Sequence, residues 1–395
     1  MARRRTSIPP IVALWVVVAA TVGCAARAPV SGTAAPSGEI GLEWLGATVY
    51  APGTLAPPGE SLRVGSVSGL AFDGRSGQWV AALDEIIRPR LAWLDVIPGG
   101  GGPTVVPRAF TFLRLVPGGA PPESIQALDM ESLVALPDGD FMTTNEGHTD
   151  RRGVPHQPVL LRIRRDGALM AAIHPRDRFR IDPADRTRGV RHNLGLESLT
   201  RTPDGRLISG LEQPLAQDGP PTSATRGGRV RLVEFVPEGA TWRPGREWAY
   251  DLDPTPAQAG YGSPCEDGEN GLSELYALDD TRLIALERAC LRGAEGAPAF
   301  NPVRLHLVDI STADDVATHD ALDGVAARPA PKRLLLDLTS LTDRMPAALR
   351  TWSNFEGIAA GPPAPDGSPT LLLVSDDNFR ATQTLAFLWL KLRGL

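Results

Sequence analysis

The sequence predicts an all-β fold, a β-propeller of five four-stranded blades whose ring is closed by an N-terminal strand. Gly (41 residues) and Pro (37 residues) are abundant between many short apolar runs, which is typical of strands joined by turns. One hairpin pattern also recurs five times along the chain. No stretch shows the sustained helical periodicity that a two-domain α/β enzyme, the competing architecture, would require.

The first residues are typical of an export signal. Three arginines at positions 3–5 precede an apolar run over residues 11–22, which is too short to span a bilayer comfortably. The run ends in the sequence TVGC, which resembles a bacterial lipobox with Thr21 in place of the usual Leu. We therefore expect residues 1–24 to be a signal peptide in which Cys24 becomes lipidated. An ordinary signal peptide, cleaved a few residues later, is the alternative.

These features predict an exported lipoprotein, anchored to a membrane of the cell envelope in the periplasm or at the cell surface. Residues 25–38 are small and flexible, which suits a tether, and residues 39–395 would form the propeller domain. We expect a monomer that contacts the membrane only through its lipid. The formal net charge of −6 argues against a nucleic-acid partner, because binding to a phosphate backbone requires a basic face.

Each repeat consists of a short apolar strand, a polar turn, a second apolar strand and an acidic end. The five hairpins span residues 68–85, 130–146, 196–212, 272–288 and 355–377. The strand-like runs that follow them are 90–96 and 110–116, 159–164 and 169–173, 229–236 and 247–252, 303–310 and 333–338, and 385–392. Four strands per repeat is the pattern of propeller blades.

The last repeat lacks a fourth strand. Residues 42–50, before the first repeat, are a strand-like run that can supply it. This pairing would close the ring and remove an exposed strand edge, which otherwise invites aggregation. Six blades are the alternative, if a divergent blade lies within residues 291–350.

Acidic residues recur at the same place in the hairpins. Taking the register from the turn centres, we expect four opposed pairs, which are Glu131 with Glu146, Glu197 with Glu212, Glu274 with Glu287, and Glu356 with Asp377. In the first hairpin Ser68 would face Glu85, with Asp84 alongside. Directly opposed like charges are destabilising, so the pairs need a bound cation, arginine partners or a shared proton.

In a propeller the first strand of each blade is innermost, so these acids would converge at one mouth of the central channel. An oxygen-rich ring suits a hard cation, and we expect Ca²⁺ there. The expected ligands are Glu85, Glu131, Glu146, Glu197, Glu212, Glu274, Glu287, Glu356, Asp376 and Asp377. The alternative is that these side chains accept backbone N–H bonds from the next blade and only hold the blades together.

The two remaining cysteines fit an oxidising compartment. Cys265 precedes one strand of the fourth hairpin and Cys290 follows the other, and a hairpin brings those two ends together. We predict a disulfide between them, with two free buried thiols as the alternative. There is no CxxC pair, so a zinc or thioredoxin-type site has no support.

The hairpins contain a set of short motifs, which are Ser68-Gly69-Leu70, Glu131-Ser132-Leu133 with Asn145-Glu146, Leu196-Glu197-Ser198-Leu199 with Leu211-Glu212, Leu286-Glu287-Arg288, and Asn354-Phe355-Glu356-Gly357 with Ser375-Asp376-Asp377-Asn378. As a set, these motifs resemble those of the phytase-like family of secreted proteins, described by an esterase-like activity of phytase. The resemblance covers roughly residues 45–395. It implies a propeller related to calcium-dependent phytases and an activity on phosphate esters.

Two functions from different classes follow, and the sequence leaves open whether the protein is an enzyme. The first is a Ca²⁺-dependent phosphoesterase that acts on a small phosphate ester, with Glu131, Glu197, Glu212 and Arg288 as candidate catalytic residues. The second is a non-catalytic envelope lipoprotein whose propeller binds a ligand or partner. A lactonase-type propeller that holds one Ca²⁺ through Glu131, Asn193 and Asp376 is a weaker alternative.

Overall fold

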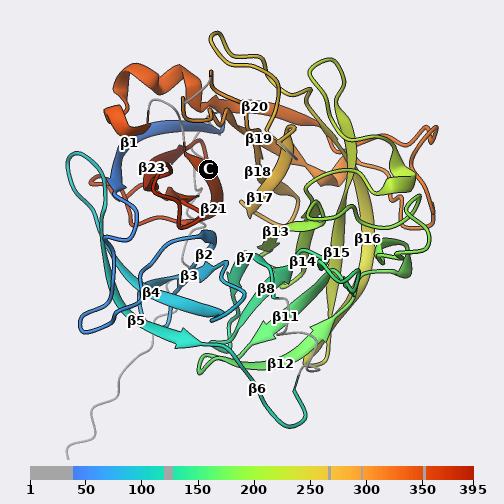
Figure 1. Cartoon of the computed structure of the whole chain (residues 1–395), viewed down its shortest axis with the longest axis horizontal. Coiled ribbons are helices and arrows are strands. Elements are labelled where there is room, and N and C mark those ends of the chain that lie inside the picture. Colours follow the sequence, from blue (N-terminus) through green and yellow to red (C-terminus); the bar gives the residue numbers. More distant parts are fainter. Residues whose placement is uncertain (1–38, 120–127, 266–267, 295–296, 350–352) are drawn as a thin grey trace, which may run out of the picture. The chain divides into compact units, whose positions relative to one another are not determined.

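Short alternating strands separated by Gly- and Pro-containing turns build a ring of five β-sheets (Figure 1). The computed structural model describes residues 39–119, 128–265, 268–294, 297–349 and 353–395. The signal segment, Cys24 and the tether lie outside these residues, so the predictions about them stay predictions. No helix in the part of the chain that the structure describes is long and apolar enough to cross a membrane.

The blades follow one another along the chain, each running from an inner to an outer strand. The first is formed by β2 (Val67–Asp73), β3 (Gln78–Leu83), β4 (Arg90–Ile97) and β5 (Thr104–Phe112). The second is formed by β7 (Met130–Ala135), β8 (Phe141–Asn145), β11 (Val159–Ile163) and β12 (Ala168–Ile173), with the two-residue β6 (Arg114–Leu115) added in parallel to β12.

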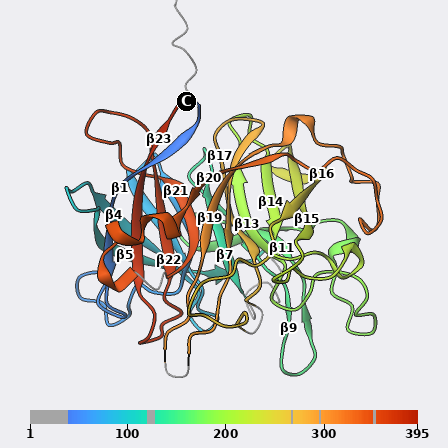
Figure 2. The ribbon, with the colours of Figure 1, turned by 90° about the horizontal axis from the view of Figure 1, so that it is seen from above.

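The third and fourth blades repeat this order. The third is formed by β13 (Leu196–Arg201), β14 (Leu207–Leu211), β15 (Gly228–Glu238) and β16 (Thr241–Leu252). The fourth is formed by β17 (Gly271–Ala277), β18 (Arg282–Arg288), β19 (Val303–Asp309) and β20 (Lys332–Asp337). A two-stranded hairpin, β9 (His148–Thr149) with β10 (Pro155–His156), stands outside the blades. Figure 2 shows β9 among the long loops that extend from one face of the ring.

The fifth blade joins both ends of the described chain. It is formed by β21 (Asn354–Ala360), β22 (Thr370–Asp376), β23 (Leu385–Arg393) and β1 (Gly41–Tyr50). β1 pairs antiparallel with β23 from Gly41 opposite Arg393 to Tyr50 opposite Leu385. The predicted five blades and the predicted closing strand are therefore confirmed.

The region that was a candidate for a sixth blade belongs to the fourth. Its described residues form β19, β20 and three short 3₁₀ helices, which are η3 (Ile310–Thr312), η4 (Leu338–Arg344) and η5 (Ala347–Leu349). Two further 3₁₀ turns, η1 (Asp177–Phe179) and η2 (Ala216–Asp218), lie in the loops around the third blade. None of these helices interrupts the ring.

Buried apolar side chains fill the spaces between neighbouring blades. Leu91 and Trp93 of the first blade pack with Leu133 and Phe141 of the second, for example, in one continuous cluster. The same arrangement recurs between the other blades. The first strands of the five sheets, β2, β7, β13, β17 and β21, line the centre of the ring (Figure 1).

Candidate functional site

Every inner strand carries a β-bulge at the same position. The bulges lie between Val67 and Gly69, Met130 and Leu133, Leu196 and Ser198, Leu272 and Glu274, and Phe355 and Gly357. A bulge leaves the extra residue outside the hydrogen-bonded ladder and re-aims its side chain. At three of the five positions this residue is a glutamate, namely Glu131, Glu197 and Glu356.

The bulges make the predicted opposed pairs wrong, although the acids do converge. In the third blade Arg201 pairs with Leu207 across an odd, five-residue turn, which shifts the register by one residue from the prediction. The bulge shifts it by one more, so that Leu196 pairs with Leu211. Glu197 and Glu212 therefore do not face each other as a ladder pair. The same two shifts separate the predicted pairs in the second and fourth blades.

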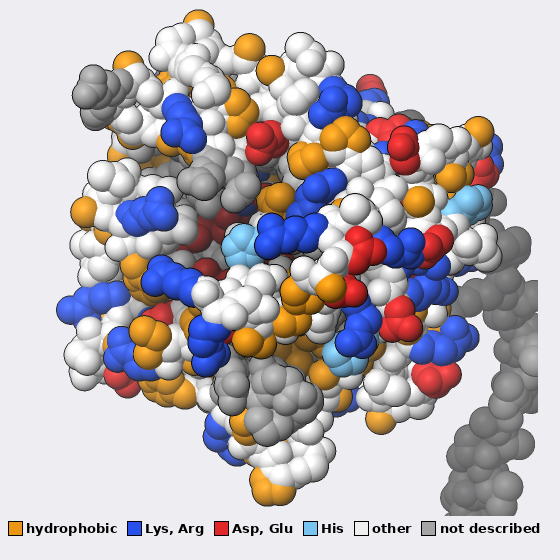
Figure 3. Space-filling view, turned by 45° about the vertical axis from the view of Figure 1, so that its right-hand side comes forward, with side chains coloured by type: hydrophobic (Ala, Val, Ile, Leu, Met, Phe, Trp, Pro, Cys, Tyr) orange, Lys and Arg blue, Asp and Glu red, His pale blue; other side chains and the backbone are white. Residues whose placement is uncertain are grey.

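The acids meet in a cavity of about 300 Å³ at one mouth of the channel, to which all five blades contribute. Its lining is almost entirely polar and consists of Ser68, Asp84, Glu131, Asn193, Glu197, Glu212, Arg288, Asn354, Glu356, Asp376, Asn378 and Arg380. Six carboxylates thus share the cavity wall with two guanidinium groups. In Figure 3 acidic side chains show in a hollow of the surface that basic and histidine side chains border.

Arg288 is the buried cation of this cavity. Its Nη2 lies 3.0 Å from Glu356 Oε1 and 3.5 Å from both Glu197 Oε1 and Glu212 Oε1. Its Nε is buried and has no hydrogen-bond partner. Burial disfavours the charged form of Arg288, but the surrounding carboxylates outweigh it and raise the pKa of the guanidinium. A single fixed positive charge therefore serves three carboxylates.

Glu131 lies at the junction of two groups of carboxylates. In the first group, three carboxylate oxygens lie within 4.8 Å of one another, one each from Glu131, Glu146 and Glu197. In the second group the same is true of one oxygen each from Asp84, Asp129 and Glu131. Among the residues that the structure describes, no hydrogen bond or ion pair reaches the Glu131 carboxylate.

Glu146 provides the test of whether a cation fits. Its Oε1 accepts a hydrogen bond from the Gly195 backbone N–H at 3.0 Å, whereas its Oε2 is buried without any partner. A buried carboxylate oxygen without a donor is costly unless a cation binds it. The oxygens of these groups are the hard ligands that Ca²⁺ prefers, so the residues present fit a Ca²⁺ ion.

The electrostatics of the cavity point the same way. Burial, followed by the charges of Glu197 and Asp129, raises the pKa of Glu131 well above its ordinary value. Burial and Asp129 raise the pKa of Asp84 to about 8. Burial likewise raises the pKa of Glu356 to about 8, although Arg288 opposes the shift, and it raises the pKa of Asp376 to about 7. Protons or a metal ion are needed to balance these charges near neutral pH.

The family follows from the sequence comparison. Residues 62–379 match the phytase-like family, described as having the esterase-like activity of phytase. The chain belongs to this phytase-like family. No curated protein matches it in sequence.

Solved structures resemble the phytase-like propeller only distantly. An endo-arabinase from Bacteroides thetaiotaomicron has 12% identity and a TM-score of 0.44, over 87% of this chain and 97% of the arabinase. The catalytic domain of an α-L-arabinofuranosidase from Coprinopsis cinerea has 11% identity and a TM-score of 0.42, over 88% of this chain and 97% of that domain.

Two of the predicted ligands instead hold the blades of the phytase-like propeller together. Glu274 is buried and accepts hydrogen bonds from Ser132 Oγ of the second blade and from the Leu199 N–H of the third. Asp377 Oδ1 accepts from the Ser66 N–H, which joins the fifth blade to the first. The alternative that acids bind neighbouring blades therefore describes these two residues.

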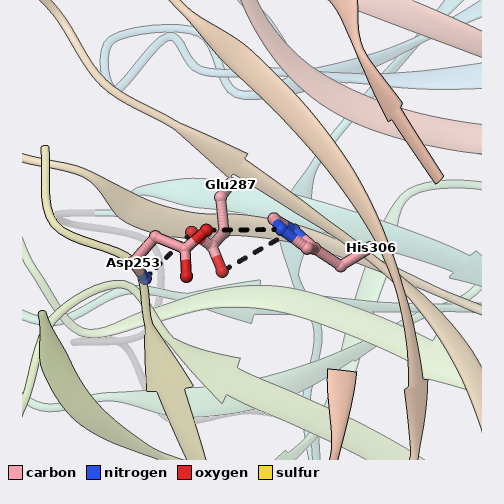
Figure 4. A group of neighbouring side chains, drawn as sticks. All are labelled: Asp253, Glu287 and His306. Carbon is pink, nitrogen blue, oxygen red and sulfur yellow. Dashed lines mark hydrogen bonds and ion pairs between the residues drawn. The ribbon is translucent and has the colours of Figure 1, made fainter. Parts of the chain in front are cut away.

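Glu287 lies away from the cavity, in a group between the third and fourth blades (Figure 4). Its carboxylate accepts from Tyr250 Oη at 2.7 Å and Asn270 Nδ2 at 2.6 Å, and it pairs with Lys332 Nζ. Lys332 also lies 2.8 Å from Asp253 Oδ1. The lysine already occupies the place that a metal ion would take between these acids.

Glu85 also lies outside the cavity lining, because it pairs with Arg90 and Arg88. Sequence reasoning missed Asp129 as a member of the acidic groups. The available signal was its position directly before β7 and two residues before Glu131.

The predicted disulfide is confirmed. Cys265 and Cys290 are bonded, with their Cα atoms 5.4 Å apart. The Cys265 N–H also donates to the Cys290 carbonyl oxygen at 2.8 Å. The disulfide lies at the open end of the β17–β18 hairpin, two residues beyond Arg288. It therefore stabilises the strand end that carries this arginine.

Proposed function

We propose that this phytase-like propeller is a Ca²⁺-dependent phosphoric ester hydrolase whose reaction takes place in the acidic cavity. The observation that carries the proposal is the unpartnered, buried Oε2 of Glu146 beside Glu131 and Glu197. Family membership supports an ester hydrolase in general terms. The proposal adds the metal, the phosphate ester and the residues.

Glu131, Glu146 and Glu197 would hold the ion, and Asp84 and Asp129 offer a second group of oxygens that shares Glu131. Bound Ca²⁺ supplies charge neutralisation of the phosphate ester and polarisation of its phosphorus centre. The pKa values of Glu131, Glu146 and Glu197 are raised, so these carboxyl groups hold protons when no ion is bound. Ligand carboxylates must be deprotonated, so these protons would be released when the ion binds.

The arginines of the cavity suit the phosphate group. Arg380 lines the wall, is exposed, and has no side-chain ion pair in the described part of the chain. Arg288 presents a buried guanidinium whose Nε has no partner. Guanidinium groups bind phosphate oxygens through short charge-assisted hydrogen bonds. We assign both residues to binding and orienting the ester.

Glu197 is the residue best placed to move a proton. It borders Arg288 and belongs to the ion-binding group, and burial together with Glu212 raises its pKa. A carboxylate whose pKa is raised is a stronger base than an ordinary carboxylate. It would accept a proton from the attacking water as the new P–O bond forms. The bond to the alcohol then breaks, and the alcohol leaves with the proton that Glu197 has accepted.

The experiment is hydrolysis of p-nitrophenyl phosphate by the purified protein with Ca²⁺ and with EGTA. We expect activity only with Ca²⁺, and a loss of at least about 100-fold in Glu131→Gln, because a ligand of the ion is removed. Glu85→Gln is the matched control and should retain activity, since Glu85 lies outside the cavity lining. Activity that persists in EGTA, or in Glu131→Gln, would contradict the proposal.

A second candidate is a non-catalytic envelope protein that binds a ligand or partner. The blade-binding roles of Glu274 and Asp377 favour it, because they show that acids of the repeated hairpins also serve the architecture. The cavity also brings together Glu131, Asn193 and Asp376, the set expected for a lactonase. Lactones therefore belong in the substrate panel, and inactivity on every ester with Ca²⁺ present would favour the binding protein.

We further propose that the protein acts outside the cytoplasm as a lipoprotein tethered through Cys24. The disulfide is consistent with an oxidising compartment.

A further inference from the structure

A second cavity of about 420 Å³ lies beside the acidic one and has the opposite electrostatic character. Its walls consist of Thr149, Gly153, Ile181, Asp182, Pro183, Arg186, Arg188, Val190, Arg191, His192 and Ala216. Three arginines and a histidine thus share the cavity with a single carboxylate. We call it the arginine pocket.

A tight turn separates the arginine pocket from the acidic cavity. The Leu194 N–H donates to the Arg191 carbonyl oxygen at 3.3 Å, and Asn193 takes up a positive φ of 53°. Arg191 and His192 line the arginine pocket, whereas the next residue, Asn193, lines the acidic cavity. The Gly195 N–H that follows donates to Glu146. A single turn, anchored on the acidic groups, therefore contributes to both cavities.

The positive charge of the arginine pocket is only partly neutralised. Arg191 is held by two backbone carbonyl oxygens, with Nε 3.1 Å from Pro214 O and Nη2 2.8 Å from Gly219 O. Neither Arg191 nor the exposed Arg186 forms an ion pair with any residue that the structure describes. Arg188 does pair with Asp320. Carbonyl oxygens fix the direction of a guanidinium but leave its net charge for an anion to balance.

The remaining lining defines the rest of the ligand. The Thr149 N–H donates to His192 Nδ1 at 3.2 Å, so a neutral His192 ring carries its proton on Nε2, where it is a further donor. Ile181, Val190 and Pro183 give the pocket an apolar wall. Donors on one side and apolar side chains on the other suit a molecule with an oxyanion group and an apolar body.

We infer that the arginine pocket is a binding site for an organic anion, in which Arg186 and Arg191 bind an oxyanion group and the Ile181–Val190 wall contacts an apolar body. Binding of an organic anion in this pocket does not depend on the proposed phosphoesterase function. Its part in catalysis, as the place where a remote anionic group of an extended substrate binds, rests on the proposed phosphoesterase function.

The test is isothermal titration calorimetry with benzylphosphonate, which carries both features and is not hydrolysed. It is made in EGTA, so that Ca²⁺ does not contribute and the result does not depend on the proposed activity. We expect saturable binding by the native protein. Methylphosphonate, which lacks the apolar body, and benzyl alcohol, which lacks the charge, should both bind more weakly.

Arg186→Ala should weaken the binding of benzylphosphonate by about tenfold, the effect of losing one charge-assisted hydrogen bond. Arg186 is exposed, so this variant is expected to fold normally. Arg226→Ala is the matched control, because Arg226 is an exposed arginine whose side chain donates to the Pro221 carbonyl oxygen and which lines neither cavity. It should leave the affinity unchanged.

Three results would overturn the inference: no saturable binding of benzylphosphonate, equal affinity in Arg186→Ala and the native protein, or equal weakening in Arg226→Ala. If benzylphosphonate binds as expected but p-nitrophenyl phosphate is not hydrolysed, the binding site stands and the proposed activity fails. If the ester is hydrolysed but benzylphosphonate does not bind in EGTA, the proposed activity stands and the inferred binding site fails.

Discussion

Two groups of buried carboxylates lie on opposite sides of β18 and differ in how their charge is balanced. Glu287 and Arg288 are consecutive residues of this strand, so their side chains point in opposite directions. Glu287 joins the group between the blades, with Asp253, His306 and Lys332. Arg288 joins the acidic cavity, with Glu197, Glu212 and Glu356.

In the Glu287 group the protein supplies its own cation. Lys332 contacts both Glu287 and Asp253, and Tyr250 and Asn270 donate to Glu287. The hydrogen bond with His306, followed by that with Lys332, lowers the pKa of Asp253. In the cavity, by contrast, one arginine serves several carboxylates whose pKa values are raised. The comparison shows that a structural cluster differs from a candidate metal site in how far the protein neutralises the carboxylates, more than in how many carboxylates there are.

The largest expected effect comes from removing the internal cation. Lys332→Met leaves Glu287 buried next to Asp253 without its lysine partner, and should lower the free energy of unfolding by about 3–5 kcal/mol. Chemical denaturation measures the change. The control is Lys391→Met. Lys391 is the only other lysine and pairs with the exposed Asp366, so the expected loss is much smaller than that of Lys332→Met. Equal losses in the two variants would erase the distinction between the groups.

A smaller effect is expected for the blade-binding glutamate. Glu274→Ala deprives the Leu199 N–H and Ser132 Oγ of their acceptor, which should cost about 1–3 kcal/mol of stability. Ca²⁺ affinity, measured by calorimetry, should remain that of the native protein, because Glu274 does not line the cavity. A loss of Ca²⁺ affinity as large as that of Glu131→Gln would place Glu274 among the ligands.

The most gradual effect is the pH dependence of stability without metal. The folded-state pKa values of Asp84 and Glu356 are about 8 and that of Asp376 is about 7, all above their ordinary values near 4. The folded protein therefore binds more protons than the unfolded chain between pH 4 and 8, and its stability falls as the pH rises through this window.

Thermal melting in EGTA between pH 5 and 8 tests this expectation. The melting temperature should decrease with pH in EGTA, and added Ca²⁺ should remove most of the decrease by taking over the role of the protons. A melting temperature that rises with pH in EGTA, or one that Ca²⁺ does not affect, would show that the cavity acids are already balanced by the protein.

Much of the fold could be predicted from the sequence, because strand alternation and turn residues are local signals. The five hairpins, the closing strand at residues 42–50 and the bond between Cys265 and Cys290 were all readable in this way. The convergence of Glu131, Glu197, Glu212, Glu356 and Asp376 on one mouth also followed, since the first strand of each blade is innermost.

The tertiary structure alone decided which acids share the cavity. The bulges at Glu131, Glu197 and Glu356 have no reliable local sequence signature. Each shifts the pairing register of its strand by one residue and so changes which side chains face the cavity. The partners of Glu287, which are Tyr250, Lys332 and Asn270, come from three separate segments. A sequence records which charges exist, whereas their neutralisation depends on groups that only folding brings within a few ångströms.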